Sequence, residues 1–79
     1  MITVIKIRYH SYGRARRYLK FPQGELSLQA GSTISDLKAA LSIPNDALVK
    51  GIIDADVMPD SHILQAGEDV GWVILVTAG

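Results

Sequence analysis

Hydrophobic and polar residues alternate along two stretches of the N-terminal half, and this alternation predicts β-strands. Within residues 3–9 every second side chain is Thr, Ile or Tyr, which is the pattern of a half-buried strand. A second alternation runs over residues 18–30 and is interrupted at Pro22-Gln23-Gly24, where we expect a bend or an irregular edge. The polar and basic segment 10–17 between them is interpreted as a loop.

The spacing of apolar residues becomes helical after Gly31. Thr33 and Asp36 resemble a capping box, in which the two residues satisfy each other's backbone N–H groups at the start of a helix. Apolar residues then recur at spacings of three and four, at Ile34, Leu37 and Leu41. Pro44 ends this pattern, so the sequence predicts one short amphipathic helix.

The C-terminal half predicts short strands separated by turns. Residues 48–53 form an apolar strand, residues 54–56 a turn, and residues 62–64 either one short strand or a single turn. Residues 70–76 are the most hydrophobic segment and are apolar on both faces, which is typical of a central strand.

The order of these elements predicts an α+β domain with a mixed sheet of four to five strands and one main helix packed on one face. Parallel pairing of the last strand with the first would make this domain a β-grasp roll. A chain of 79 residues forms one domain. It contains no cysteine, which excludes disulfides and thiol chemistry. No apolar run is long enough to span a membrane, and Met1–Lys6 does not read as a signal peptide. We therefore expect a cytoplasmic protein.

Charge is distributed unevenly although the formal net charge is zero. Residues 1–20 contain six basic and no acidic residues, whereas residues 21–79 contain two basic and eight acidic ones. Such a split indicates either an interaction surface or two halves that neutralise each other in a small fold, and we favour the second interpretation.

The basic segment places arginines among aromatic residues, with Arg14, Arg16 and Arg17 between Tyr12 and Tyr18. Cations beside aromatic rings suit nucleic-acid binding, but the zero net charge argues against that function. A protein partner with an acidic groove explains the cluster equally well.

The sequence offers no intrinsic catalytic residue, no metal site and no bound cofactor. His10 and His62 lack the spacing of metal ligands. Asp54, Asp56 and Asp60 lack the glycine and the closing glutamate of a calcium loop. Independent catalysis is therefore not expected.

The last residues, Thr77-Ala78-Gly79, carry little side-chain bulk and follow directly on the hydrophobic strand. A tail of this kind can thread a narrow channel. The unhindered carboxylate of a terminal glycine can attack the α-phosphate of ATP to form an acyl-adenylate, from which a sulfur nucleophile displaces AMP. Small residues are also common at chain ends that have no such role, so the tail alone leaves both interpretations open.

Over nearly its whole length the chain resembles the ubiquitin-like sulfur carriers of the MoaD/ThiS family. Four segments carry the resemblance: Ile2–Arg8, Tyr12–Arg17, Gly31–Leu37 and Leu64–Val70. The resemblance implies a ubiquitin-like β-grasp domain of residues 1–76 with a flexible C-terminal tail of residues 77–79.

The resemblance also implies a carrier rather than an enzyme. An E1-like adenylating enzyme would use ATP to activate Gly79, sulfur from a persulfide donor would convert the adenylate to a thiocarboxylate, and a synthase subunit of molybdopterin or thiamine biosynthesis would accept the sulfur. Thr77 and Ala78 would thread the partner's channel. An exposed apolar face near Trp72, Ile74 and Val76 would dock the partner.

Two departures from the family bear on this expectation. The family normally ends in Gly-Gly, whereas this chain ends in Ala78-Gly79, and the added methyl group removes backbone freedom at position 78. Leu75-Val76 replaces the proline often seen before the tail. Two alternatives stay open: a β-grasp binding or regulatory module that does not conjugate, and a nucleic-acid-binding domain that uses Arg14, Arg16 and Arg17.

Overall fold

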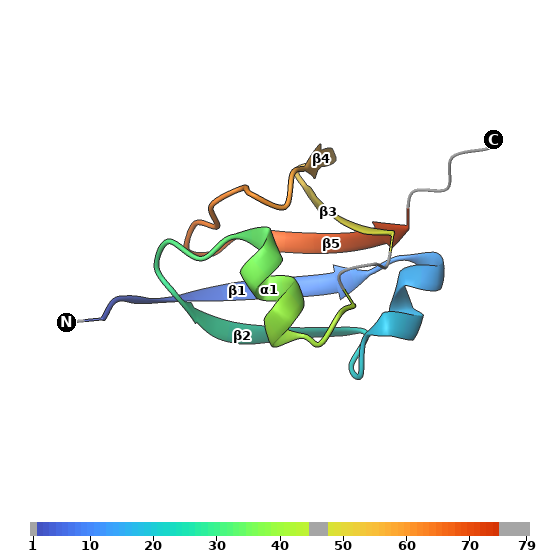
Figure 1. Ribbon diagram of the computed structural model, residues 1–79, viewed down its shortest axis with the longest axis horizontal. Coiled ribbons are helices and arrows are strands. Elements are labelled where there is room, and N and C mark those ends of the chain that lie inside the picture. The colour runs from blue at the N-terminus through green and yellow to red at the C-terminus, as the bar shows by residue number, and fades with distance from the viewer. Residues whose placement is uncertain (1, 45–47, 75–79) are drawn as a thin grey trace.

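The part of the chain that the structure describes forms a five-stranded mixed sheet with one α-helix packed across one face (Figure 1). The computed structural model describes residues 2–44 and 48–74. The helices are α1 (Ile34–Ala40) and the 3₁₀-helix η1 (Gly13–Tyr18). The strands are β1 (Val4–Ser11), β2 (Gln23–Gln29), β3 (Val49–Ile53), β4 (Asp56–Met58) and β5 (Asp69–Ile74). The predicted α+β, β-grasp architecture is confirmed.

The sheet has the strand order β2-β1-β5-β3-β4. β1 and β5 pair in parallel at its centre, with Tyr9 opposite Val70 and His10 opposite Gly71. The other three pairings, β1 with β2, β3 with β5 and β3 with β4, are antiparallel. The predicted central position of the hydrophobic last strand is therefore confirmed as far as Ile74. Residues 75 and 76, which the sequence assigns to the same strand, lie outside the described residues.

The core lies between the sheet and α1. Alternate side chains of β1, those of Ile5, Ile7 and Tyr9, are buried there, while the side chains between them face the opposite side of the sheet. The largest fully buried side chains are Trp72, Ile7, Ile34, Leu37, Leu64, Val49 and Val70. These belong to β1, β3, β5, α1 and the loop before β5, so one core ties the whole domain together.

The helix α1 begins at the predicted capping box. The backbone N–H of Thr33 donates to Asp36 Oδ2 at 2.9 Å, and the N–H of Asp36 donates to Thr33 Oγ1 at 3.3 Å. Lys38 in the same helix is only 4% exposed. Its Nζ donates to the two carboxylate oxygens of Asp60 at 3.0 and 3.2 Å, so the one buried charge among the described residues is paired.

Three local predictions differ from the structure. Residues 10–17 are not a loop, because His10 and Ser11 extend β1 and η1 follows at Gly13. The second alternating stretch enters the sheet only from Gln23 onwards. Residues 62–64 form neither a strand nor a turn, and Ile63 makes a single antiparallel bridge with Thr33.

The predicted turn at residues 54–56 is shorter than expected, because Asp56 already belongs to β4. Asp54 and Ala55 alone connect β3 to β4, with φ values of 52° and 68°. Two consecutive left-handed residues are the geometry of a tight hairpin turn, which favours Asn-Gly and disfavours alanine. The backbone at Ala55 is therefore strained.

Candidate functional site

The end of the sheet where β5 finishes is the place from which the predicted tail continues. Ile74 is the last described residue there, and Val76, Thr77, Ala78 and Gly79 lie outside the described residues. The N–H of Tyr12 donates to the carbonyl of Trp72 at 2.9 Å, which ties the start of η1 to the end of β5. A hollow of about 290 Å³ opens at this junction and is lined by Tyr12, Gly13, Arg14, Val73 and Ile74.

The prediction that Trp72 lies on an exposed docking face is wrong. Its side chain is 0% exposed and belongs to the core on the helix side of the sheet. Ile74 follows two residues later on the same side and is half-buried against that core. The outward side of β5 carries Gly71 and Val73 instead, because successive side chains of a strand point to opposite faces.

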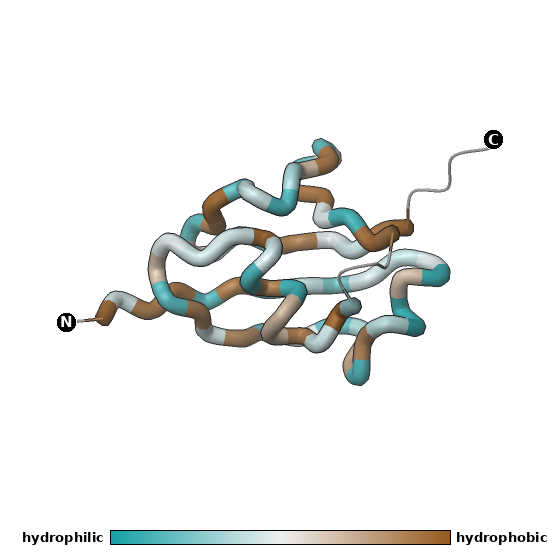
Figure 2. The backbone as a smooth tube through the Cα atoms, in the orientation of Figure 1, coloured by the Kyte–Doolittle hydropathy of each residue, from teal (hydrophilic) through white to brown (hydrophobic). Residues whose placement is uncertain are grey.

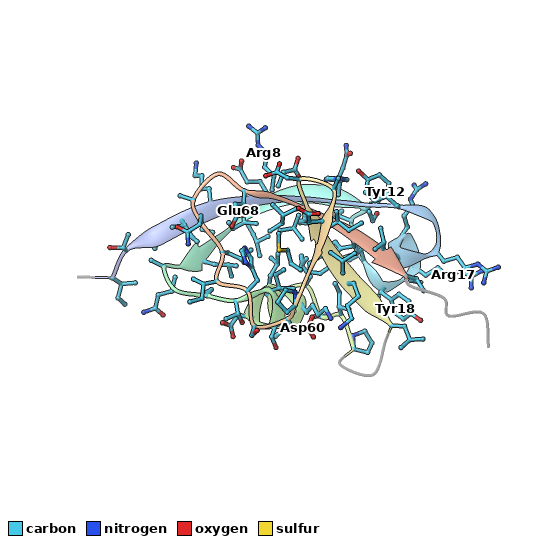
Figure 3. The ribbon with its side chains drawn as sticks, turned by 90° about the horizontal axis from the view of Figure 1, so that it is seen from above. Arg8, Tyr12, Arg17, Tyr18, Asp60 and Glu68 are labelled. Atoms are coloured by element: carbon cyan, nitrogen blue, oxygen red, sulfur yellow. The ribbon has the colours of Figure 1, made fainter. Side chains whose placement is uncertain are left out.

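Three exposed arginines stand on η1. A 3₁₀-helix has three residues per turn, and here Ala15 occupies the side that packs on the core with 0% exposure. Arg14, Arg16 and Arg17 occupy the other two sides and are exposed. Figure 2 shows hydrophilic residues along this turn, and Figure 3 shows Arg17 extending past the end of the sheet. We call these three arginines the basic pole.

The basic pole has no acidic counterpart among residues 2–44 and 48–74. The ion pairs of lysine and arginine in this part of the chain are Arg8–Glu25 and Lys38–Asp60, while the carboxylates of Asp69 and Glu68 lie 2.8 and 3.5 Å from ring nitrogens of His10 and His62. Three partly exposed aromatic residues flank the pole: Tyr12, Tyr18 and Phe21, at 52%, 38% and 62%. The two predicted halves of opposite charge therefore do not neutralise each other at this end of the described structure.

A hydrogen-bonded cluster lies beside the same junction, on the sheet face opposite α1. His10 Nδ1 is 2.8 Å from Asp69 Oδ1, and His10 Nε2 is 2.7 Å from the Tyr12 hydroxyl oxygen. The rings of His10 and Tyr12 meet edge to face, with centroids 4.9 Å apart. An ionised Asp69 accepts from Nδ1–H, which leaves Nε2 to accept the proton of the phenol. The cluster therefore fixes the position of the Tyr12 side chain over β1 and β5, next to the start of η1.

Gly71 makes room for this cluster. A Cβ at position 71 would lie 2.9 Å from Tyr12 Cε2 and 3.0 Å from His10 Nε2. Sequence reasoning missed the cluster because His10 and Asp69 are 59 residues apart. The signal that could have found it is the parallel pairing of the first and last strands, which sets His10 opposite Gly71.

Within residues 2–44 and 48–74, no group of three or more His, Asp or Glu side chains is placed to hold a metal ion. No helix in that part of the chain is both long enough and apolar enough to cross a membrane.

The comparisons with known proteins find similarity in structure rather than in sequence. No family model matches the chain, and no curated protein matches it. The structure of SAMP1 from Haloferax volcanii is similar with a TM-score of 0.68 and 10% identity, over 94% of this chain and 99% of that one. A putative molybdopterin converting factor, subunit 1, from Pyrococcus furiosus is similar with a TM-score of 0.73 and 19% identity, over 91% and 99%.

A third similar structure is described as "Molecular Mimicry of SUMO promotes DNA repair" and has a TM-score of 0.63 with 15% identity, over 90% of this chain and 91% of that one. Identities this low show the fold alone. The chain therefore has a ubiquitin-like β-grasp fold.

Proposed function

We propose that this chain is a ubiquitin-fold sulfur carrier, a protein co-substrate rather than an enzyme. The observation that carries the proposal is the central position of β5, which ends at Ile74, three positions before the small residues Thr77-Ala78-Gly79 in the sequence. The similar structures support it, because one is a small archaeal modifier protein and another a putative molybdopterin converting factor subunit. In this proposal residues 1–76 form the folded domain and residues 77–79 its reactive tail.

The proposed chemistry takes place on Gly79 inside partner enzymes. A carboxylate oxygen of Gly79 attacks the α-phosphorus of ATP, which forms the acyl-adenylate and releases pyrophosphate. The terminal sulfur of a persulfide then attacks the acyl carbon and expels AMP, leaving an acyl disulfide. A second thiol cleaves this disulfide, so that Gly79 carries a thiocarboxylate and the two thiols leave as a disulfide. ATP and both thiols belong to the partners, and this chain binds no cofactor of its own.

The residues around the end of β5 serve partner recognition in this proposal. Ile74 and Val76 contact the E1-like adenylating enzyme or the sulfur-accepting synthase subunit, and Thr77 and Ala78 pass through its channel. Trp72 does not contact the partner in this proposal. Its buried side chain anchors the end of β5 in the core and so positions the residues that follow. The first acceptor to test is a molybdopterin-type synthase, given the name of the Pyrococcus furiosus neighbour; a thiamine-type acceptor is the second.

The test is the intact mass of the chain after incubation with ATP, a persulfide donor, a thiol and an E1-like enzyme from the same organism. We expect a mass increase equal to the exchange of one oxygen for one sulfur. Deletion of Gly79 abolishes this increase, and Ala78→Gly preserves or accelerates it, because glycine restores backbone freedom in the channel. An unmodified chain in both the wild type and Ala78→Gly contradicts the proposal.

A second candidate function is a β-grasp module that binds a partner without conjugation. The cluster of His10, Tyr12 and Asp69 favours it, since this built polar surface on the open sheet face has no part in the chemistry at Gly79. The same experiment separates the two candidates. Binding of the partner that persists without Gly79, with no mass change in any variant, identifies the module.

A further inference from the structure

We propose that the basic pole binds an acidic surface of the partner protein that receives the C-terminal end of this chain. The inference rests on the proposed function and deepens it, because it names the chemistry by which the partner is recognised. Three observations carry it: the arginines are exposed and make no ion pair with a described residue, they lie beside the end of β5, and the rest of the chain carries a net negative charge.

The arginines do little for the fold. η1 is held to the core by Ala15 and to β5 by the Tyr12 N–H, whereas Arg14, Arg16 and Arg17 point to solvent. No ion pair in the described structure involves them. Like charges on neighbouring positions of one helical turn repel each other, which costs stability rather than adding it. A bound acidic surface would attract each arginine and so offset the repulsion among them.

The position of the pole connects it to the tail. Arg14 lines the same hollow as Val73 and Ile74, so a cationic residue and two apolar residues lie side by side where β5 ends. A hydrophobic centre with a polar rim is the ordinary composition of a protein–protein interface. Residues 75–79 follow Ile74 in the sequence, and Ile74 lines the same hollow as Arg14. A partner that binds these residues would therefore also lie near Arg14. The charges of the arginines would then speed the association with the partner and fix the relative orientation of the two proteins.

The rest of the molecule argues for a protein surface over a nucleic acid. Residues 21–79 carry a net charge of −6, from two bases and eight acids. The formal net charge of the whole chain is zero, whereas nucleic-acid-binding domains are usually basic overall. An acidic patch on a protein therefore fits the pole better than an extended polyanion does.

The experiment compares two double charge reversals of equal size. The pole variant is Arg14→Glu with Arg17→Glu, which lie one 3₁₀ turn apart on the same side of η1. The matched control is Lys6→Glu with Arg8→Glu, on the outer face of β1. Both variants are first checked for folding by circular dichroism and urea unfolding, and Arg14→Gln with Arg17→Gln replaces the pole variant if its fold is impaired.

The readout is adenylation of the carrier by the E1-like enzyme, followed as pyrophosphate exchange at low and at high salt. We expect the pole variant to raise KM about tenfold or more at low salt, which corresponds to about 1.4 kcal/mol, with kcat within about twofold. High salt should shrink the difference, and the control should stay near the wild type. An unchanged KM in the pole variant overturns the inference and leaves the proposed function standing.

Failure of both the wild type and Ala78→Gly to be adenylated contradicts the proposed function, and a second measurement then decides the inference. Binding of a fluorescent peptide of ten glutamates is compared with binding of a strand of ten deoxythymidines. Peptide binding lost in the pole variant supports an acidic protein surface, and no peptide binding overturns it. Tighter binding of the oligonucleotide assigns the pole to nucleic acid. Sedimentation at low salt tests for a dimer. A dimer that forms in the wild type and not in the pole variant assigns the pole to a second copy of this chain.

Discussion

Two regions of this small domain differ in how their positively charged side chains are placed: α1 buries its lysine, whereas η1 exposes its arginines. On the helix side, Lys38 is buried to 4% exposure and both oxygens of Asp60 bind its ammonium group. At the basic pole, Arg14, Arg16 and Arg17 are exposed, and no ion pair of the described residues involves them. A charge that folding buries must be compensated within the fold. A charge left at the surface is available to another molecule.

The same contrast holds along β5. Val70 and Trp72 point into the core and are fully buried, whereas Gly71 and Val73 point away from α1. The inner residues therefore set the stability of the domain, and the outer ones shape the surface around His10 and Tyr12. Substitutions on the two sides should separate folding from recognition.

The largest effect should follow from Trp72→Ala. Truncating a fully buried tryptophan costs about 3–5 kcal/mol of the free energy of unfolding, a large part of the roughly 5–15 kcal/mol that holds a domain together. Urea unfolding followed by circular dichroism measures the loss. Val73→Ala, next to it on the outer side, is the matched control and should cost less than about 1 kcal/mol. Equal losses of unfolding free energy in the two variants would refute the view that the inner residues of β5 stabilise the domain and the outer ones do not.

A smaller effect should follow from Asp60→Asn, which leaves the Lys38 ammonium group buried with only a neutral partner. Removing one member of a fully buried pair costs about 3–5 kcal/mol. The Asp60 side chain is 44% exposed, so water can reach the pair, and we expect about 2 kcal/mol. Lys38→Met removes the charge but keeps the apolar stem, and should cost less than Asp60→Asn in the same unfolding experiment. A greater loss for Lys38→Met would mean that the ion pair itself stabilises the fold.

The smallest effect should follow from replacing all three arginines of the basic pole by glutamine. Because these side chains are exposed and make no ion pair with a described residue, the free energy of unfolding should change by less than about 0.5 kcal/mol. Thermal unfolding of the variant beside the wild type measures this. A loss above about 1 kcal/mol would assign the arginines a structural role and remove the contrast with Lys38.

The sequence predicted the elements whose patterns are strong and local. The alternation in β1, the capping box of Thr33 and Asp36, and the doubly apolar last strand each follow from side-chain spacing. Each is confirmed, the last strand as far as Ile74. The parallel pairing of the first and last strands was expected for a β-grasp roll and is also confirmed.

The features that sequence reasoning missed depend on tertiary contacts or on short elements. η1 is a single short 3₁₀-helix with Ala15 as its one buried residue, which leaves no periodicity to detect. β4 has three residues and forms only by pairing with β3. Alternation places Trp72 and Val73 on opposite faces, but α1 decides which face is the inner one, so the burial of Trp72 was assigned wrongly.

The adjacency of β1 and β5 has a consequence for how the protein is made. The two central strands come from nearly opposite ends of the described chain, and their pairing is non-local. During synthesis the ribosome releases β1 early, and β1 has no central neighbour until β5 has emerged. A chain that stops short of β5 lacks Val70 and Trp72, and Trp72 is the largest fully buried side chain of the core. Truncated translation products should therefore be unfolded and cleared by proteases, so that only finished molecules accumulate.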